Sequence, residues 1–172
     1  GTRKGLMILE PRATGSWEIA QQAFLGSPVT MVLSDPRDDA LYCALNLGHF
    51  GAKMHRSEDG GETWTEIATP AFPKREAADA PSVGMIWALE AAGPDMPGTI
   101  WAGTMPAGLF RSGDKGETWR LNAALDSLPE KAEWFGGGND APGIHSVEIH
   151  PKESRRIILG VSCGGAWATA DG

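Results

Sequence analysis

The chain has 172 residues, of which 41% are hydrophobic and 22% are charged, and its net charge is −7. A chain of this composition can bury a hydrophobic core of ordinary size. The acidic balance and the lack of a basic stripe argue against nucleic acid as a partner. No apolar run reaches the length of about 18 residues that a membrane span needs.

Short apolar runs separated by glycine and proline are typical of an all-β protein with frequent tight turns. In chain order, the predicted strands are residues 1–9, 15–19, 29–33, 41–44, 64–67, 83–89, 99–103, 119–121, 144–149 and 157–161, with one further strand running into Ser57 and another into Ser112. Cys43 and Cys163 lie far apart in the sequence, and we expect two free, buried thiols and no cofactor. The start at Gly1 has no signal-peptide pattern, which favours a cytoplasmic location.

A turn motif recurs between these strands. Residues 57–64 and 112–119 match at six of eight positions, 55 residues apart, and a third copy begins at Thr169. Four short strands per unit of about 50–60 residues are typical of a blade of a β-propeller.

The repeat predicts a single partial propeller over residues 1–172, with about three blades of four strands. It divides into a half blade at 1–20, whole blades at 28–68 and 82–122, and an incomplete blade at 144–172. Closed propellers have about four to eight blades, so we expect this chain to form part of a ring of six to eight. A natural chain of this length is expected to self-associate, because an open arc leaves strand edges bare.

The motif Ser-x-Asp-x-Gly-x-Thr-Trp resembles the Asp-box, or BNR repeat. That repeat is found in sialidases, sortilin-type receptors, xyloglucanase-type glycoside hydrolases and photosystem assembly factors. The chain also resembles bacterial BNR-repeat proteins labelled exo-α-sialidase or glycosyl hydrolase, through residues 1–6, 106–112, 133–135 and 145–146. The resemblance implies a propeller with Asp-box turns and a carbohydrate, protein or peptide as ligand.

Turn chemistry gives the motif residues a structural role. The aspartate accepts N–H bonds across the turn, the glycine takes a positive φ, and the tryptophan packs between strands. A calcium site at Asp59 with Glu58 and Glu62 is the weaker alternative, because a loop of alternating oxygen ligands is missing, and we expect no metal. The predicted structural residues are Ser57, Asp59, Gly61, Thr63, Trp64, Ser112, Asp114, Gly116, Thr118 and Trp119.

The resemblance implies that the ligand face is the one opposite the Asp-box turns, where enzymes of this architecture have their pocket. The loops 46–51, 104–108 and 162–165 reach this face, with the long connections 68–82 and 122–143. Aromatic rings beside carboxylates in these loops suit a carbohydrate. The candidate residues are His49, Phe50, Met105, Glu133, Trp134, Phe135 and His145.

The remaining histidines have other interpretations. His55 lies in a strand beside an Asp-box and is predicted to be an outward surface residue. His150 takes the place of Asp35 in a turn and is predicted to be structural. For His145, a structural role and contact with a ligand both stay open.

Two functions stay open. Sialidases use a tyrosine nucleophile, but Tyr42 aligns with Trp101 and Ile158 in the second strand of each blade, which predicts a core position and disfavours a classical sialidase. A glycosidase with two carboxylates remains an alternative, and its candidates in the long connections are Glu76, Asp79, Asp126, Glu130, Glu133 and Asp140. We favour a binding or scaffold propeller of undefined ligand, and we assign no catalytic residue.

Overall fold

The computed structural model describes residues 1–74 and 81–172. In this part of the chain most of the regular structure is β-strand, with one short α-helix and two 3-10 helices. The strands form several antiparallel sheets, so the prediction of an all-β fold is confirmed. Among these residues, no helix is long and apolar enough to cross a membrane.

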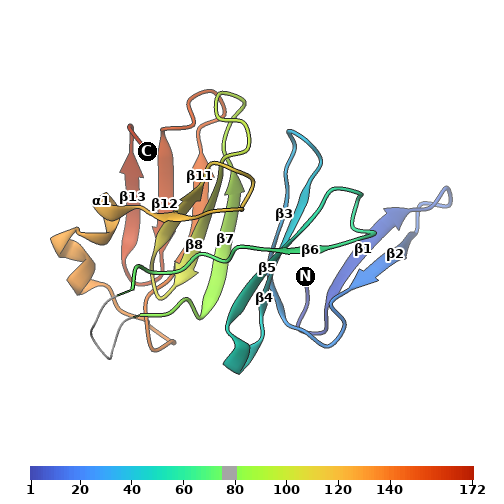
Figure 1. Ribbon diagram of the computed structural model, residues 1–172, viewed down its shortest axis with the longest axis horizontal. Coiled ribbons are helices and arrows are strands. Elements are labelled where there is room, and N and C mark those ends of the chain that lie inside the picture. The colour runs from blue at the N-terminus through green and yellow to red at the C-terminus, as the bar shows by residue number, and fades with distance from the viewer. Residues whose placement is uncertain (75–80) are drawn as a thin grey trace.

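Each sheet is a run of consecutive strands, and the sheets follow one another along the chain (Figure 1). We name them the N-terminal sheet (β1–β2), sheet 1 (β3–β6), sheet 2 (β7–β10) and sheet 3 (β11–β13). The strands are β1 (Leu6–Pro11), β2 (Trp17–Ala23), β3 (Val29–Ser34), β4 (Leu41–Asn46), β5 (Ala52–Ser57), β6 (Thr65–Ile67), β7 (Met85–Ala91), β8 (Ile100–Met105), β9 (Leu109–Ser112), β10 (Arg120–Leu121), β11 (Ile144–Ile149), β12 (Ile157–Val161) and β13 (Gly165–Thr169). The helical segments are η1 (Gly48–Phe50), α1 (Ala123–Asp126) and η2 (Pro129–Glu133).

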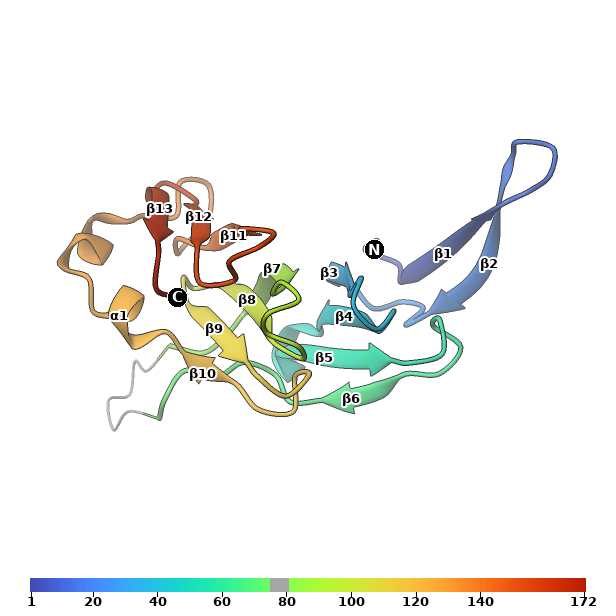
Figure 2. The same ribbon diagram turned by 90° about the horizontal axis from the view of Figure 1, so that it is seen from above.

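The sheets stand side by side in a curved row when the molecule is seen from above (Figure 2). The first strands of sheets 1 to 3, which are β3, β7 and β11, lie along the inside of the curve. Contacts of β7 with both β3 and β11 join these inner strands. The last strands β6 and β10 lie on the outside.

Antiparallel pairing places alternate connections at opposite ends of each sheet. The turns β3–β4, β7–β8 and β11–β12 lie at one end, at the top of Figure 1, with the turns that follow β5 and β9. We call this end the turn side. The loops β4–β5, β8–β9 and β12–β13 lie at the other end, together with the starts of the inner strands, and we call it the loop side.

Apolar side chains fill the spaces between neighbouring sheets. Tyr42 and Phe110 are fully buried in the cluster between sheets 1 and 2. Trp101 and Ile144 belong to the cluster between sheets 2 and 3, and Leu6 belongs to a smaller one that joins the N-terminal sheet to sheet 1. Each sheet is therefore held by the next, and the hydrophobic core is divided among the three interfaces.

The two outermost sheets expose apolar side chains. On the N-terminal sheet, Leu9, Trp17 and Ile19 are 52%, 66% and 52% exposed. On sheet 3, Ile158 is 56% exposed, whereas Trp101, in the matching place on sheet 2, is 3% exposed. The difference arises because another sheet covers Trp101.

Two expectations need correction. The N-terminal sheet extends past residue 20 to Ala23, because Ala23 still pairs with Leu6 across the hairpin. Cys43 is buried as expected, but Cys163 is exposed. Cys163 lies in the tight β12–β13 loop, with a positive φ of 47°, and not within a strand.

His55 is also placed differently from its prediction. It is half-buried, and its ring lies 4.7 Å from that of Phe24, which in turn lies 5.1 Å from Trp64. Phe24 follows β2, so the N-terminal sheet supplies the ring that covers this histidine. Burial lowers the pKa of His55, an effect that Glu66 opposes and Lys53 increases.

We therefore expect the free energy of unfolding to decrease as pH falls below about 6.5, the usual pKa of histidine. The folded chain holds His55 neutral, so the unfolded chain binds the proton more tightly and protonation favours unfolding. His55→Gln should weaken this pH dependence in urea unfolding between about pH 7 and about pH 5. His49→Gln, at an exposed position, is the control. A His55→Gln protein that keeps the wild-type pH dependence would show that another group is responsible.

Candidate functional site

Each inner strand carries a β-bulge near its start, on the loop side. The register against the second strand shifts between Val29 and Met31 in β3, between Ile86 and Ala88 in β7, and between Ile144 and Ser146 in β11. The extra residues are Thr30, Trp87 and His145. A bulge re-aims a side chain and is common next to functional sites. The bulge recurs at one position in three sheets, so Thr30, Trp87 and His145 hold matching places on the inner strands, and we call these three residues the bulge row.

Two members of the bulge row pack against each other. The ring centroids of Trp87 and His145 lie 6.0 Å apart at an interplanar angle of 68°, an edge-to-face contact. Trp87 is half-buried and His145 is exposed. Neighbouring glycines make room for the rings: a Cβ added to Gly143 would lie 2.7 Å from Trp87, and one added to Gly160 would lie 2.7 Å from His145. Larger residues at these glycines would push the rings away.

Met105, another predicted candidate, lies beside this pair. It ends β8, pairs with Met85, and is half-buried. The Cβ added to Gly143 would lie 3.1 Å from Met105, so Met105 and Trp87 flank the same glycine. The structure thus brings together Met105 and His145 from the predicted set.

The other candidates are dispersed. His49 and Phe50 are exposed on η1 of sheet 1, with Phe50 81% exposed. Phe135 is 62% exposed, and Glu133 is exposed at the end of η2. Trp134 is 9% exposed, with its ring 5.5 Å from that of Trp167. Trp134 therefore packs in the core between sheets 2 and 3 and offers little surface to a ligand.

The sequence did not identify Thr30 or Trp87 as a candidate site residue. Trp87 was assigned only to a strand, and its redirected side chain depends on strand register. The available signal was the alignment of Thr30, Trp87 and His145 at the same position of three repeats.

On the turn side, the Ser-x-Asp turns after β5 and β9 form matching hydrogen-bond networks. The Ser57 hydroxyl donates to Asp59 Oδ1 (2.7 Å) and accepts from Gly61 N (2.8 Å), while Thr63 N donates to Asp59 Oδ1 (2.9 Å). Gly61 needs its positive φ of 97° and its lack of a side chain, because an added Cβ would lie 2.3 Å from Ile8. The turn of Ser112, Asp114, Gly116 and Thr118 repeats these bonds.

These bonds keep both aspartates charged. Hydrogen bonds from Thr63, with help from Ser57, lower the pKa of Asp59 to about 2. Thr118 and Ser112 do the same for Asp114. Among the described residues no cluster of three histidines, cysteines or carboxylates is placed to hold a metal ion. The Asp59 oxygens instead accept bonds within their own turn.

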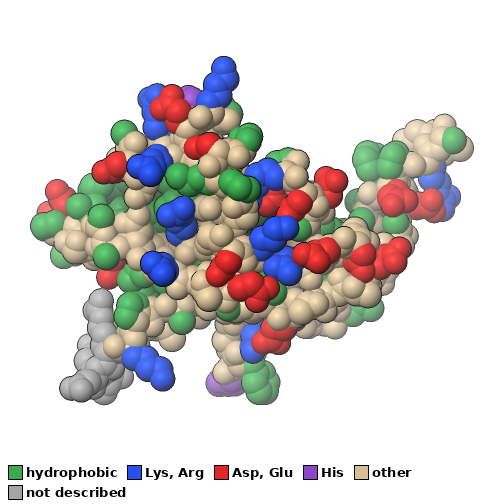
Figure 3. Space-filling model, turned by 45° about the horizontal axis from the view of Figure 1, so that its top comes forward, with side chains coloured by type: hydrophobic (Ala, Val, Ile, Leu, Met, Phe, Trp, Pro, Cys, Tyr) green, Lys and Arg blue, Asp and Glu red, His purple; other side chains and the backbone are tan. Residues whose placement is uncertain are grey.

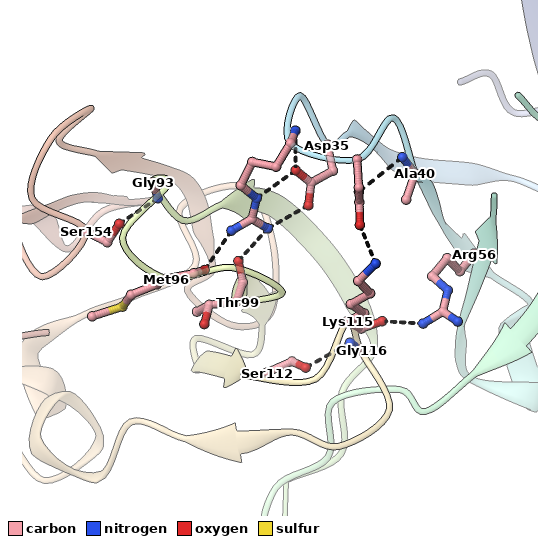
Figure 4. A network of polar contacts seen from close by, with 12 residues as sticks. Asp35, Ala40, Arg56, Gly93, Met96, Thr99, Ser112, Lys115, Gly116 and Ser154 are labelled. Atoms are coloured by element: carbon pink, nitrogen blue, oxygen red, sulfur yellow. Dashed lines mark hydrogen bonds and ion pairs between the residues drawn. The ribbon is translucent and has the colours of Figure 1, made fainter.

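Contacts between neighbouring turns tie the sheets together on this side (Figure 4). The Arg37 guanidinium binds the buried Asp35 carboxylate and donates to the carbonyl oxygens of Met96 (2.8 Å) and Thr99 (2.9 Å) on sheet 2. The Ser154 hydroxyl accepts from Gly93 N (2.6 Å), which joins sheet 3 to sheet 2. The polar contacts on the turn side therefore hold neighbouring sheets together.

His150 repeats part of this turn chemistry. Lys152 N donates to His150 Nδ1 (3.3 Å) as Arg37 N donates to Asp35 Oδ1 (3.0 Å). This bond supports its predicted structural role.

Two groups bear on possible catalysis. Tyr42 is fully buried, which raises its pKa to about 12 and withdraws it from any substrate. Burial also raises the pKa of Glu90 on β7, and the charge of Glu148 on the neighbouring inner strand β11 adds to the rise.

The predicted carboxylates Glu76 and Asp79 lie outside the described residues. Another predicted carboxylate, Asp126, forms an ion pair with Lys131, whose Nζ lies 2.5 Å from Asp126 Oδ1.

Comparison with solved structures identifies the architecture. The GH74 xyloglucanase from Xanthomonas campestris matches over 92% of this chain and 23% of its own, with a TM-score of 0.58 and 20% identity. YCF48 bound to D1 peptide matches over 98% of this chain and 52% of its own, with a TM-score of 0.58 and 16% identity. The fold is that of part of a β-propeller. YCF48 from Cyanidioschyzon merolae matches this partial propeller with a TM-score of 0.59 and 12% identity, over 96% of this chain and 45% of its own.

In sequence, the propeller is similar to a probable oligoxyloglucan-reducing end-specific xyloglucanase from Neosartorya fischeri. The two are 30% identical over 145 residues, which cover 82% of this chain and 16% of the relative. No protein-family model matches the chain. The chain is thus a distant homologue of a xyloglucanase and spans a small part of its length.

Proposed function

We propose that the chain is part of a ligand-binding propeller of six to eight blades, with its ligand site at the bulge row. Sheets 1 and 2 form whole blades at 28–68 and 82–122, the N-terminal sheet forms a half blade that ends at Ala23, and sheet 3 forms an incomplete blade at 144–172. The Ser-x-Asp turns are its Asp-boxes. Their repeated bonds, together with the exposed Trp17 and Ile158 on the outermost sheets, support a longer ring that further blades or a second copy complete.

The observation that carries the proposal is the recurrence of a bulge at Thr30, Trp87 and His145. A bulge interrupts the strand ladder, so three in register are hard to explain by packing alone. They also lie on the loop side, away from the turn-side bonds that hold the sheets together.

The ligand we favour is a peptide segment of a protein partner. Trp87 is half-buried, with His145 at its edge and Met105 beside the same glycine, and Met85 pairs with Met105. These neighbours suit an apolar side chain. Methionine adapts its shape to such ligands. YCF48, which shares the fold, has been solved with a peptide bound. A sugar would need a broad, open ring face, and a carbohydrate stays the second ligand class.

Trp87→Ala should weaken peptide binding about ten-fold to a hundred-fold, because aromatic anchors dominate such interfaces. The measurement selects peptides from a phage-displayed library on the wild-type chain, then titrates the selected peptides by calorimetry. Trp17→Ala, which removes an exposed tryptophan on the N-terminal sheet, is the matched control and should leave affinity unchanged. Equal affinities for the wild type and Trp87→Ala would place the site elsewhere.

A glycoside hydrolase is the second candidate, on two observations. The chain resembles a xyloglucanase in sequence, and Glu90 combines a raised pKa with a neighbouring carboxylate, Glu148. A raised pKa suits a general acid in glycoside hydrolysis. Release of reducing ends from xyloglucan oligosaccharides, lost in Glu90→Gln, would favour this function. Turnover unchanged by Glu90→Gln would exclude Glu90 as the acid.

A further inference from the structure

The interface between the N-terminal sheet and sheet 1, which we call the N-terminal interface, is built without charged contacts. Its apolar cluster includes Leu6 from β1 and Cys43 from β4. Among the described residues no ion pair joins these two sheets, whereas Lys115 of sheet 2 pairs with Asp38 of sheet 1. In the space-filling view the N-terminal sheet forms a lobe at one end of the molecule (Figure 3). Apolar and aromatic side chains therefore carry this contact.

His55 is the titratable ring inside the N-terminal interface. It pairs with Cys43 across β4 and β5, so the two side chains share the face that the N-terminal sheet covers. Phe24 packs on the His55 ring from the segment after β2. His55 Nδ1 is buried and has no hydrogen-bond partner among the described residues. A neutral imidazole leaves one acceptor unpaired here, but an imidazolium would bury a charged N–H without an acceptor, which costs more.

The surrounding groups do not favour a charge on this ring. Glu66 on β6 pairs with His55, but its carboxylate is already bound by Lys53 Nζ at 2.6 Å. Cys43, which faces His55 from β4, is neutral because burial raises its pKa to about 12. Phe24 contributes an uncharged ring. Burial therefore outweighs Glu66 and lowers the pKa of His55.

We propose that the N-terminal interface is a pH-sensitive contact: protonation of His55 separates Phe24 and the N-terminal sheet from sheet 1, while sheets 1 to 3 stay folded. Separation lets the imidazolium reach water, which removes the cost of its burial. The clusters between sheets 1 and 2 and between sheets 2 and 3 contain no residue of the N-terminal sheet. A local opening of this kind is distinct from unfolding of the whole chain, and it does not depend on the ligand of the bulge row.

The direction of the pH effect follows from the neutral state of His55 in the closed contact. The open state binds the proton more tightly, so the contact is fully present above about pH 6.5, the usual pKa of histidine, and weakens as pH falls below it.

The two cysteines provide the measurement. Cys43 is fully buried in the N-terminal interface, whereas Cys163 is exposed and reports the intrinsic rate of a thiol reagent at each pH. The reagent is 4,4′-dithiodipyridine, a disulfide that labels thiols in mild acid, and peptide mapping by mass spectrometry separates the two rates. We expect the rate at Cys43 relative to Cys163 to rise about three-fold to ten-fold between about pH 7 and about pH 5.

Three variants assign the effect. His55→Gln keeps a polar side chain but takes up no proton, so its rate ratio at about pH 5 should stay at the value of about pH 7. His49→Gln, at an exposed position, is the matched control and should keep the wild-type rise. Phe24→Ala removes the ring that covers His55 and should raise the ratio already at neutral pH.

Three results would overturn the proposal. One is a rate ratio that does not change with pH in the wild type. Another is a rise in His55→Gln as large as that in the wild type, which would assign the effect to a different group. The third is a Cys43 rate that increases with low concentrations of urea as steeply as global unfolding does, because a local opening exposes less surface and has a smaller urea dependence.

Discussion

Arg37→Met is expected to lower the free energy of unfolding by about 3–5 kcal/mol, the range for breaking one half of a buried ion pair. Asp35 is 2% exposed, and Arg37 binds it through Nε (2.8 Å) and Nη2 (2.6 Å). The hydrogen bond with Asp35 also raises the pKa of Arg37. Methionine keeps most of the side-chain volume but leaves the Asp35 carboxylate buried without its cation.

The loss extends beyond the pair because Arg37 also links sheets. It donates to two carbonyl oxygens of the β7–β8 turn, those of Met96 and Thr99, which would lose these donors. Urea unfolding should show a lower midpoint at an unchanged slope. The matched control is Arg12→Met: Arg12 pairs with Glu18 at the surface, and its loss should cost less than about 1 kcal/mol. Equal losses in the two variants would mean that Asp35 finds another partner.

The turn chemistry could be predicted from the sequence because it is local. Hydrogen bonds join Ser57, Asp59 and Thr63 within one short turn, and the same turn requires a glycine at Gly61. Repetition of the motif 55 residues later then indicated repeated sheets. Short-range hydrogen bonding and turn conformation suffice for that inference.

The candidate site was less predictable because it depends on contacts between distant segments. The bulge at Trp87 exists only in the register of β7 against β8, which a single strand does not reveal. His55 is covered by Phe24 from the preceding sheet, and Trp134 is buried by Trp167 from the following one. In each case contacts with another segment of the chain determine how exposed the side chain is, and therefore whether a ligand can reach it.

Replacing both turn aspartates, in Asp59→Asn/Asp114→Asn, is expected to remove much of the acid sensitivity of the fold. Each carboxylate has a pKa of about 2, well below the usual value of about 3.9. The unfolded chain therefore takes up these protons first as pH falls. The stabilisation from each turn is present above about pH 3.9 and is lost progressively toward about pH 2.

The double variant should be less stable than the wild type at neutral pH, because an amide is a weaker acceptor for Thr63 and Thr118 than a carboxylate. Its stability should then change less than that of the wild type between about pH 4 and about pH 2. Urea midpoints measured across this range test both expectations. Glu62→Gln removes an acidic group from the same loop but keeps the Asp59 carboxylate, so it is the control. If the double variant loses stability with acid as steeply as the wild type, the acid sensitivity arises outside these turns, in groups such as Asp38 that join neighbouring sheets.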